Sequence, residues 1–202
     1  MIQPKKYKIC RRLGAGVYEK CQTAKFAASA ANKKGKRSDK RPKPLSDFGA
    51  HLVEKQKVRF SYGVSEKQFS NYVKKATEKK GAAPTDSLFE SLESRLDNVV
   101  YRTGLANTRA LARQMVSHGH FMVNGKRTTV PSFAIRPGDV VSVREGSRSK
   151  GFFNGLDARL KTYTVPEWLT FDQSKMEAKV SQKPKHTEGF FNLNAVLEFY
   201  SR

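Results

Sequence analysis

The alternation of apolar and polar residues predicts two helices across residues 46–80. The sequence SYGV separates them, and Gly63 suits the position that follows a helix C-terminus. Ser46 or Asp47 is a suitable N-cap for the first helix and Ser65 for the second, because their side chains accept hydrogen bonds from unpaired backbone N–H groups. This part of the chain is therefore predicted to be helical.

A second pair of helices is predicted after a linker at 80–87, where Pro84 acts as a helix breaker. In the stretch DSLFESLESRLDNVVYRTG, one helix face collects the apolar residues Leu88, Leu92, Leu96 and Val99. In NTRALARQMVSHG, Asn107 or Thr108 is a suitable cap and Gly119 a suitable end. Both helices are expected to be short and amphipathic.

The pattern changes from helical to extended beyond Gly119. The runs FMV, KRTTV and VVSVR are rich in residues that favour strands. Asn124-Gly125 favours a type I′ hairpin turn, and Pro137-Gly138 suits the centre of a type II turn. The chain is thus predicted to have an α+β fold, with a mostly helical region and a small, strongly turned sheet.

Charge points to the class of partner. The net charge is +21, and residues 1–45 alone contain fourteen Lys or Arg against two acids. Such self-repulsion favours a polyanionic partner. RNA or DNA fits better than an anionic membrane, because no basic amphipathic helix stands out. We interpret residues 1–45 as an irregular basic arm that orders on a phosphate backbone; the alternative is a disordered tail.

The cysteines and histidines give little indication of a metal or a reaction centre. Cys10 and Cys21 are too few for a disulfide framework and are expected to stay reduced. Their separation of eleven residues does not suit a zinc site, so neither metal nor cofactor is predicted. His118 and His120 flank Gly119 at a helix-to-strand joint, where the two rings are expected to point in different directions. His118 is instead a candidate phosphate contact.

No apolar run approaches the ~18 residues of a membrane span, and the N-terminus lacks the apolar core of a signal peptide. The expected location is the cytoplasm, or the interior of an organelle.

The stretch SRLDNVVYRTG…TRALARQMVSHGHFMVNGKRTTVPSFAIRPGDVVSVRE resembles the RNA-binding module named after ribosomal protein S4. That module also occurs in pseudouridine synthases, a heat-shock RNA-binding protein and tyrosyl-tRNA synthetases. The flanks, at 45–76 and in VPEWLTFDQSKMEAKV…NLNAVLEFYSR, are similar to the bacterial-type small ribosomal subunit protein S4 family. The resemblance covers residues 9–202.

The resemblance implies a structural, non-enzymatic constituent of the small ribosomal subunit. Family members bind ribosomal RNA first and nucleate assembly of the subunit body at a multi-helix junction in the 5′ domain. They contact ribosomal protein S5, lie near S3, and help to form the path by which mRNA enters, with a role in translational accuracy. The ribosome concerned is cytoplasmic or that of an organelle. Some members hold zinc on four N-terminal cysteines; only the place of Cys10 is matched here, so no zinc is carried over.

The resemblance also implies a discontinuous domain organisation. Residues 1–45 are the basic arm, 46–87 form a helical domain completed by 160–202, and 88–159 form the S4-type module. The shared core of the helical domain is expected to include Val165, Trp168, Leu169, Val196, Leu197 and Phe199.

Cations grouped by spacing are the predicted RNA contacts. Arg95 and Arg102 are seven residues apart, and Arg109 and Arg113 four apart, which places each pair on one helix face. The alternative is an ordinary solvated surface. The full predicted set is Arg11, Arg12, Lys55, Lys57, Arg59, Arg95, Arg109, Arg113, His118 and Lys126.

Two other functions compete with the ribosomal interpretation. An enzyme that uses the module to hold RNA would need a phosphate-binding loop or a nucleophile motif in the remaining residues, and none is visible. A free RNA chaperone of the heat-shock type would lack the C-terminal PEWLTFD segment. The ribosomal interpretation therefore ranks first.

Overall fold

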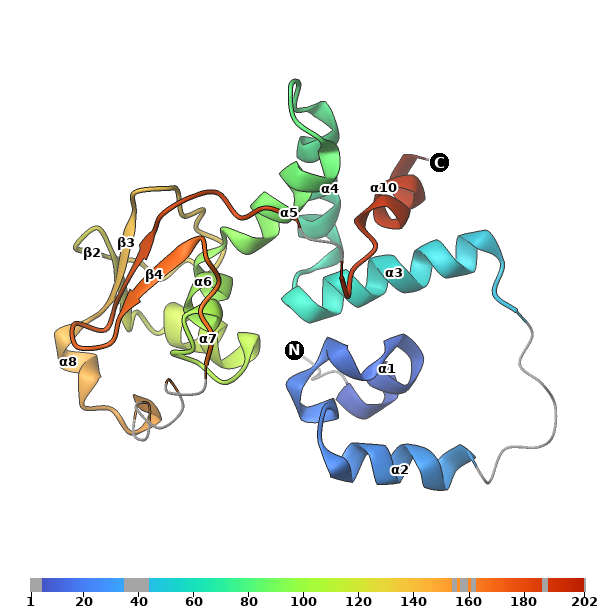
Figure 1. Ribbon diagram of the computed structural model, residues 1–202, viewed down its shortest axis with the longest axis horizontal. Helices are drawn as coiled ribbons and strands as arrows, with labels where there is room; N and C mark the ends of the chain where they lie inside the picture. Colours follow the sequence, from blue (N-terminus) through green and yellow to red (C-terminus); the bar gives the residue numbers. More distant parts are fainter. Residues whose placement is uncertain are drawn as a thin grey trace. The chain divides into compact units, whose positions relative to one another are not determined.

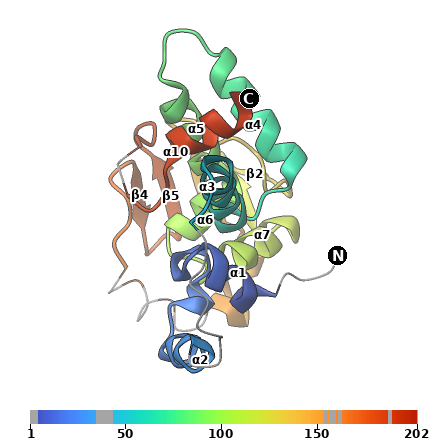
Figure 2. The same cartoon turned by 90° about the vertical axis from the view of Figure 1, so that its right-hand side faces the viewer.

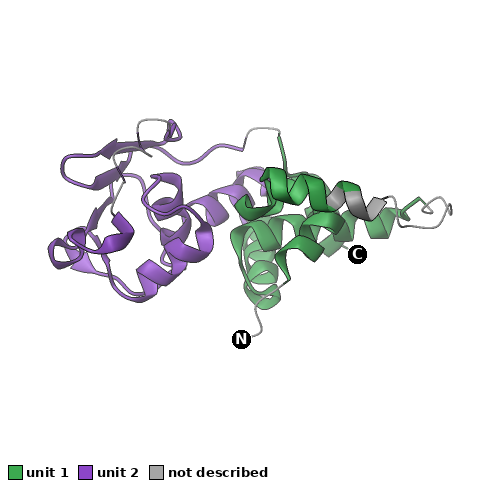
Figure 3. Cartoon of the chain, turned by 90° about the horizontal axis from the view of Figure 1, so that it is seen from below, with its two compact units in different colours: residues 1–78, 187–202 green, residues 79–186 purple. Residues whose placement is uncertain are grey.

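The structure is a computed structural model that describes residues 5–34, 44–153, 156, 160, 163–186 and 189–201. The chain divides into two compact units, described separately below (Figure 3). Unit 1 comprises residues 1–78 and 187–202, and unit 2 comprises residues 79–186. Among the described residues, no helix is long and apolar enough to cross a lipid bilayer.

The described part of unit 1 contains helices and no strands (Figure 1). The N-terminal arm, expected to be irregular, forms α1, two short 3-10 helices and α2 within residues 5–34. Residues 1–4 and 35–43 of the predicted arm lie outside the described residues. The helices of the unit are α1 Lys6–Leu13, η1 Ala15–Val17, η2 Glu19–Cys21, α2 Ala24–Lys34, α3 Asp47–Tyr62, α4 Glu66–Glu78 and α10 Leu193–Ser201.

The arm has a small core of its own. Cys10 in α1 and Cys21 at the end of η2 are each 2% exposed and are joined by a disulfide. The expectation of two reduced thiols is therefore wrong for this structure. The reason is that α1 and η2 fold onto one another and bring both side chains into one apolar cluster with Leu13, Val17 and Phe26.

The boundaries of α3 and α4 confirm the capping predictions. Ser46 Oγ accepts a hydrogen bond from the backbone N–H of Gly49 at 3.2 Å, and Ser65 Oγ accepts one from Gln68 at 3.3 Å. Gly63 has a φ of +63°, the left-handed conformation that ends many helices. Local hydrogen bonding therefore determines where both helices begin and where the first one ends.

The C-terminal helix α10 packs against α3 and α4 (Figure 2). The Phe48 and Phe199 rings lie 5.4 Å apart, and the Phe69 and Tyr200 rings 6.1 Å apart. Val196 is fully buried. Segments more than 130 residues apart in the sequence thus form one hydrophobic core.

Unit 2 combines helices with a five-stranded antiparallel sheet of order β2-β1-β3-β5-β4. This arrangement confirms the predicted α+β fold class. The helices are α5 Pro84–Glu93, α6 Leu96–Arg102, α7 Arg109–Ser117, α8 Glu145–Arg148 and the 3-10 helix η3 Gly151–Phe153. The strands are β1 Phe121–Val123, β2 Lys126–Arg127, β3 Val140–Val143, β4 Leu169–Asp172 and β5 Glu177–Val180.

Both predicted turns are present. Asn124 and Gly125 have φ values of +50° and +77°, as a type I′ hairpin turn requires. Gly138 has a φ of +95°, and the N–H of Asp139 donates to the Arg136 carbonyl at 3.0 Å, which fits a type II turn.

The helix predicted over 86–103 is broken into α5 and α6. Arg95 adopts an extended conformation and pairs with Ala134 in an isolated β-bridge. The N–H of Leu96 donates to Phe133 and the N–H of Ile135 donates to Ser94, both through backbone carbonyls. The apolar face is nevertheless kept, because Leu88, Leu92, Leu96 and Val99 are all fully buried.

The predicted core of residues 160–202 needs a correction. Leu169 belongs to β4, which pairs with β5, and β5 pairs with β3 of the module. Val165 and Trp168 pack against the same core as Leu169, in unit 2. These three residues therefore belong to the sheet and core of unit 2.

Candidate nucleic-acid interface

The ten predicted contact residues differ widely in exposure. The exposed ones are Arg11, Arg12, Arg113, His118 and Lys126, the half-buried ones are Lys57, Arg59 and Arg109, and the buried ones are Lys55 and Arg95. Because a phosphate must be reached through solvent, this division separates candidate contacts from structural cations.

In the arm, α1 places its cations on the outside. Arg11 and Arg12 lie in its last turn and are exposed, whereas the neighbouring Cys10 and Leu13 are buried. Cations at a helix C-terminus also interact favourably with the helix dipole. Both arginines are therefore available to a polyanion.

In α3, Lys55 is held inside unit 1. Its ammonium group lies 2.6 Å from Glu66 Oε1 and 4.6 Å from the centre of the Phe199 ring. Burial raises the pKa of Glu66, but hydrogen bonds from Lys55 and Tyr200 outweigh this effect, and the pKa is lowered. Burial, and then the hydrogen bond to Glu66, raises the pKa of Tyr200. Lys55 is thus buried and paired with a carboxylate inside unit 1, which leaves little of its charge accessible to a phosphate.

The other two predicted residues of α3 also have acidic partners. Lys57 Nζ lies 2.6 Å from Glu54 Oε1, and Arg59 Nη1 lies 3.4 Å from Glu66 Oε2. Each cation also lies over an aromatic ring, Lys57 over Phe190 at 5.0 Å and Arg59 over Phe60 at 4.5 Å. These contacts reduce the charge that α3 offers to a polyanion.

In the module, Arg95 is the largest side chain that is almost fully buried, at 1% exposure. Its guanidinium donates to both oxygens of Asp97, at 3.0 and 2.7 Å. The sequence placed Arg95 and Arg102 on one helix face, but the break before α6 removes that relation, and Arg102 donates to Glu93. Arg95 is therefore not a surface contact.

Helix α7 keeps part of the predicted cationic face. The side chain of Arg113 is 46% exposed, with Nη1 3.8 Å from Asp97 Oδ2. Arg109 donates to Asn98 Oδ1 at 2.8 Å and lies 4.3 Å over the Tyr101 ring. Arg113 is the more accessible of the two.

The joint between α7 and β1 gathers further cations. The His118 and His120 rings lie edge to face with their centres 6.0 Å apart, so the two side chains are near one another while their ring planes differ by 67°. Arg127 Nη2 donates to the His118 carbonyl at 3.4 Å, and the N–H of Arg144 donates to the His120 carbonyl at 2.9 Å. Lys126 is exposed in β2, beside Arg127.

Sequence reasoning missed Arg127 and Arg144 as candidate contacts. Both are exposed, and neither forms an ion pair with a carboxylate within the described ranges. Part of the signal was available in the sequence. Phe121 and Val123 are apolar and must face the core, so the residues that alternate with them along the strand, His120 and Met122, lie on the outer face of the sheet. What the sequence lacked was the strand register that places these arginines next to His120.

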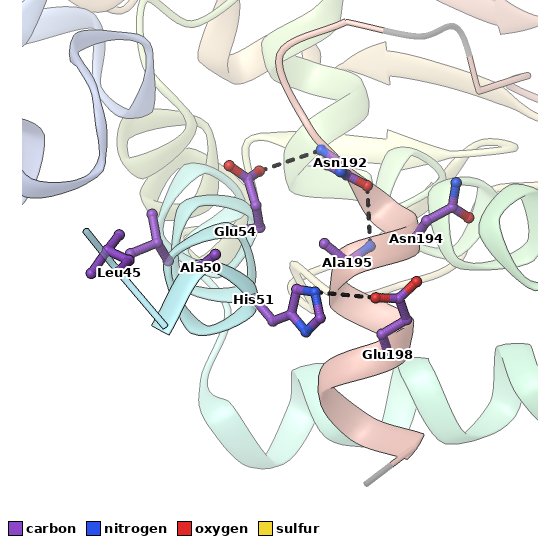
Figure 4. A pocket seen from close by; sticks show the side chains of 9 residues that line it. Leu45, Ala50, His51, Glu54, Asn192, Asn194, Ala195 and Glu198 are labelled. Carbon is purple, nitrogen blue, oxygen red and sulfur yellow. Dashed lines mark hydrogen bonds and ion pairs between the residues drawn. The ribbon is translucent and has the colours of Figure 1, made fainter. Parts of the chain in front are cut away.

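Unit 1 contains a pocket of a different chemical character, about 470 Å³ in volume, between the N-terminal part of α3 and α10 (Figure 4). His51 Nε2 lies 3.1 Å from Glu198 Oε2, and Glu54 Oε2 accepts a hydrogen bond from the N–H of Asn192 at 3.4 Å. Leu45, at the rim, is 66% exposed. Carboxylates and exposed apolar groups make this pocket unsuitable for RNA phosphates.

Comparisons with known proteins identify the family of the chain. The family description "Ribosomal protein S4/S9 N-terminal domain" matches residues 2–93, and "S4 domain" matches residues 94–141. The chain is 40% identical over 197 residues to the small ribosomal subunit protein uS4 of Akkermansia muciniphila, covering 96% of each chain. It is 43% identical over 203 residues to that of Syntrophobacter fumaroxidans, again covering 96% of each. For Magnetococcus marinus the identity is 41%, with 98% of this chain and 97% of the relative covered.

Proposed function

The chain belongs to the uS4 family of small ribosomal subunit proteins, and we propose that it binds small-subunit ribosomal RNA through the exposed cations of its arm and module. The matched relatives are ribosomal proteins and not enzymes, which confirms the expectation of a non-enzymatic role. The proposed location follows from the same family: the small ribosomal subunit of a cytoplasmic or organellar ribosome.

The observation that carries this proposal is the separation of the cations into two groups. Lys55, Arg95 and Arg102 are bound to carboxylates inside the units. Arg11, Arg12, Lys126 and Arg127 are exposed, and the structure shows no ion pair for them within its described part. A protein that leaves such a group unneutralised can displace counterions from a phosphate backbone.

Specificity is proposed to come from the shape of the RNA. The grooves of A-form RNA hide most sequence information, so a folded junction is recognised chiefly by its backbone. Both units present cations on rigid helices and strands, which suits recognition of fixed phosphate positions.

A salt titration on protein-free small-subunit rRNA tests the function. With about five phosphate contacts, log K against log salt should have a slope of about −4.5, a loss of roughly 500-fold between about 50 and 200 mM salt. The variant Arg11→Gln with Arg12→Gln should reduce the slope by about 1 to 2. Lys57→Gln is the control, because Lys57 is paired with Glu54, and its slope should stay unchanged. A flat slope for the wild-type protein would exclude electrostatic binding.

The family also supports finer proposals. We propose that the protein nucleates assembly of the subunit body by binding a multi-helix junction of the 5′ domain before other proteins do. We further propose that it lies on the path by which mRNA enters, near proteins S3 and S5, and influences accuracy there. Binding to protein-free rRNA tests the first; cross-linking of mRNA to the assembled subunit tests the second.

The α3–α10 pocket is the proposed contact surface for protein S5. Leu45 and Phe48 are 66% and 51% exposed, which is unusual for large apolar side chains without a partner. His51 Nδ1 is buried and has no hydrogen-bond partner in the described part of the chain. A protein surface can cover the apolar side chains and supply a hydrogen-bond partner for His51 Nδ1. RNA, in contrast, would be repelled by Glu54 and Glu198.

Substitution of Leu45 tests this contact. Leu45→Asp should weaken capture of S5 by about tenfold or more, because it places a charge in a desolvated contact. Binding of rRNA should be unaffected. Val130→Asp is the matched control, since Val130 is also exposed, at 52%, but lies in unit 2. Equal capture of S5 by the wild-type protein and by Leu45→Asp would place that contact elsewhere.

A further inference from the structure

The outer face of the sheet next to α7 carries a set of cations whose arrangement follows from strand register. Met122 pairs with Arg127 across β1 and β2, and Phe121 pairs with Val143 across β1 and β3. Phe121 and Val143 are fully buried, so their side chains face the core. Directly opposed residues share a face and successive residues alternate, which places His120 and Met122 on the other face.

The same geometry brings two arginines to His120. Arg144 follows Val143 and stands opposite His120, as the hydrogen bond from its N–H to the His120 carbonyl shows. Arg127, paired with Met122, is the diagonal neighbour of His120 on that face, a separation of roughly 7–8 Å between Cα atoms. The Arg127 guanidinium lies directly against Gly119, where a side chain would occupy its place.

Helices α8 and η3 provide further neighbours of His120. His120 Nδ1 lies 3.0 Å from Ser147 Oγ, and the His120 and Phe152 rings are 4.9 Å apart. Lys150 lies between Ser147 and Phe152 in the chain and is exposed. Glu145, at the start of α8, is exposed as well, and within the described residues it forms no ion pair with these cations.

We propose that His118, His120, Arg127, Arg144 and Lys150 form a phosphate-binding site for the RNA backbone at the joint between α7 and the sheet. The inference rests on the RNA-binding function proposed above and names a site within it. Gly119 is part of the site, because a Cβ at this position would require the Arg127 guanidinium to move. Its φ of +73° also favours glycine.

The electrostatics of His120 agree with this geometry. Burial, and then the charges of Lys150, His118, Arg127 and Arg144, lower the pKa of His120. A bound phosphate dianion or diester opposes these charges and favours the protonated imidazole. Binding should therefore raise the pKa of His120 and add one more cation to the site.

Two measurements on the full chain test the site. In the first, inorganic phosphate is titrated and the imidazole C–H resonances are followed by NMR across pH, with His120→Gln for assignment. We expect the His120 pKa to rise on addition of phosphate, and less so in Arg127→Gln with Arg144→Gln. In the second, the rRNA salt titration of that double variant should show an affinity lower by about tenfold or more and a slope reduced by about 1 to 2.

The control is Arg136→Gln with Lys175→Gln, which removes the same charge from exposed residues of unit 2 outside the cluster. If the double variant binds rRNA with the wild-type slope, the site is wrong and the RNA-binding function stands. If the wild-type protein does not bind rRNA, the proposed function fails. In that case the phosphate titration still tests the site, because a His120 pKa that does not change when phosphate is added would show that no phosphate binds there.

Discussion

Replacing Arg95 with methionine is expected to lower the free energy of unfolding of unit 2 by about 3–5 kcal/mol. Arg95 and Asp97 are 1% and 4% exposed, and the guanidinium donates to both carboxylate oxygens. Methionine keeps much of the volume but leaves Asp97 as a buried charge without its main partner. Urea unfolding followed by the fluorescence of Trp168 measures the loss of unfolding free energy. Trp168 is the single tryptophan of the chain and packs against the hydrophobic core of unit 2.

Two further variants separate the buried charge from a general loss of packing. Arg113→Met removes the second cation near Asp97, but its side chain is 46% exposed, so a change below about 1 kcal/mol is expected. Arg95→Met combined with Asp97→Leu removes both charges and should recover a large part of the loss. If the combined variant is as unstable as Arg95→Met alone, the unpaired carboxylate is not the cause.

Structure that depends on a few neighbouring residues was predictable from the sequence. Ser46 caps α3 through a bond to Gly49, three residues away, and Gly63 ends the helix by its own backbone freedom. Asn124-Gly125 forms the hairpin turn for the same reason. Each outcome depends on preferences within one turn, and those preferences are visible in the residues themselves.

The break between α5 and α6 was not predictable in this way. The apolar spacing of Leu92, Leu96 and Val99 continues across it and indicates one helix. What interrupts the helix is pairing with a segment almost forty residues away, through the bonds of Leu96 to Phe133 and Ile135 to Ser94. Strand β5 was missed for a related reason, because its partner β3 is remote in the sequence. Strand β4 was missed with it, since β4 pairs with β5.

The candidate site shows the same limit. The net charge of +21 indicated a polyanionic partner, but charge alone does not tell which cations are neutralised inside the fold. Asp97 binds Arg95 and Glu66 binds Lys55, so two of the predicted contact residues are buried in ion pairs. Arg127 and Arg144 were missed because their neighbourhood depends on strand register. The sequence therefore predicts the class of partner, a polyanion, but not which cations lie on the surface that binds it.

The second large loss of stability is expected on substitution of Glu93, because its side chain bridges the break between α5 and α6. Its side chain is 1% exposed and accepts hydrogen bonds from Arg102 Nε and Nη2, at 2.8 and 2.7 Å, and from Asn98 Nδ2 at 2.8 Å. Glu93→Ala leaves these donors without the carboxylate and should destabilise unit 2 by about 3 kcal/mol or more. The same urea unfolding experiment measures the loss.

Glu90 in the same helix is the matched control. It pairs with Lys79 at 3.2 Å and Lys183 at 3.1 Å, but its side chain is 27% exposed and both lysines are more exposed still. Glu90→Ala should therefore cost less than about 1 kcal/mol. Equal losses for the two variants would contradict a special role for Glu93. A much larger loss for Glu93→Ala would show that the break in the predicted helix is stabilised by buried charge as well as by backbone pairing with residues 131–135.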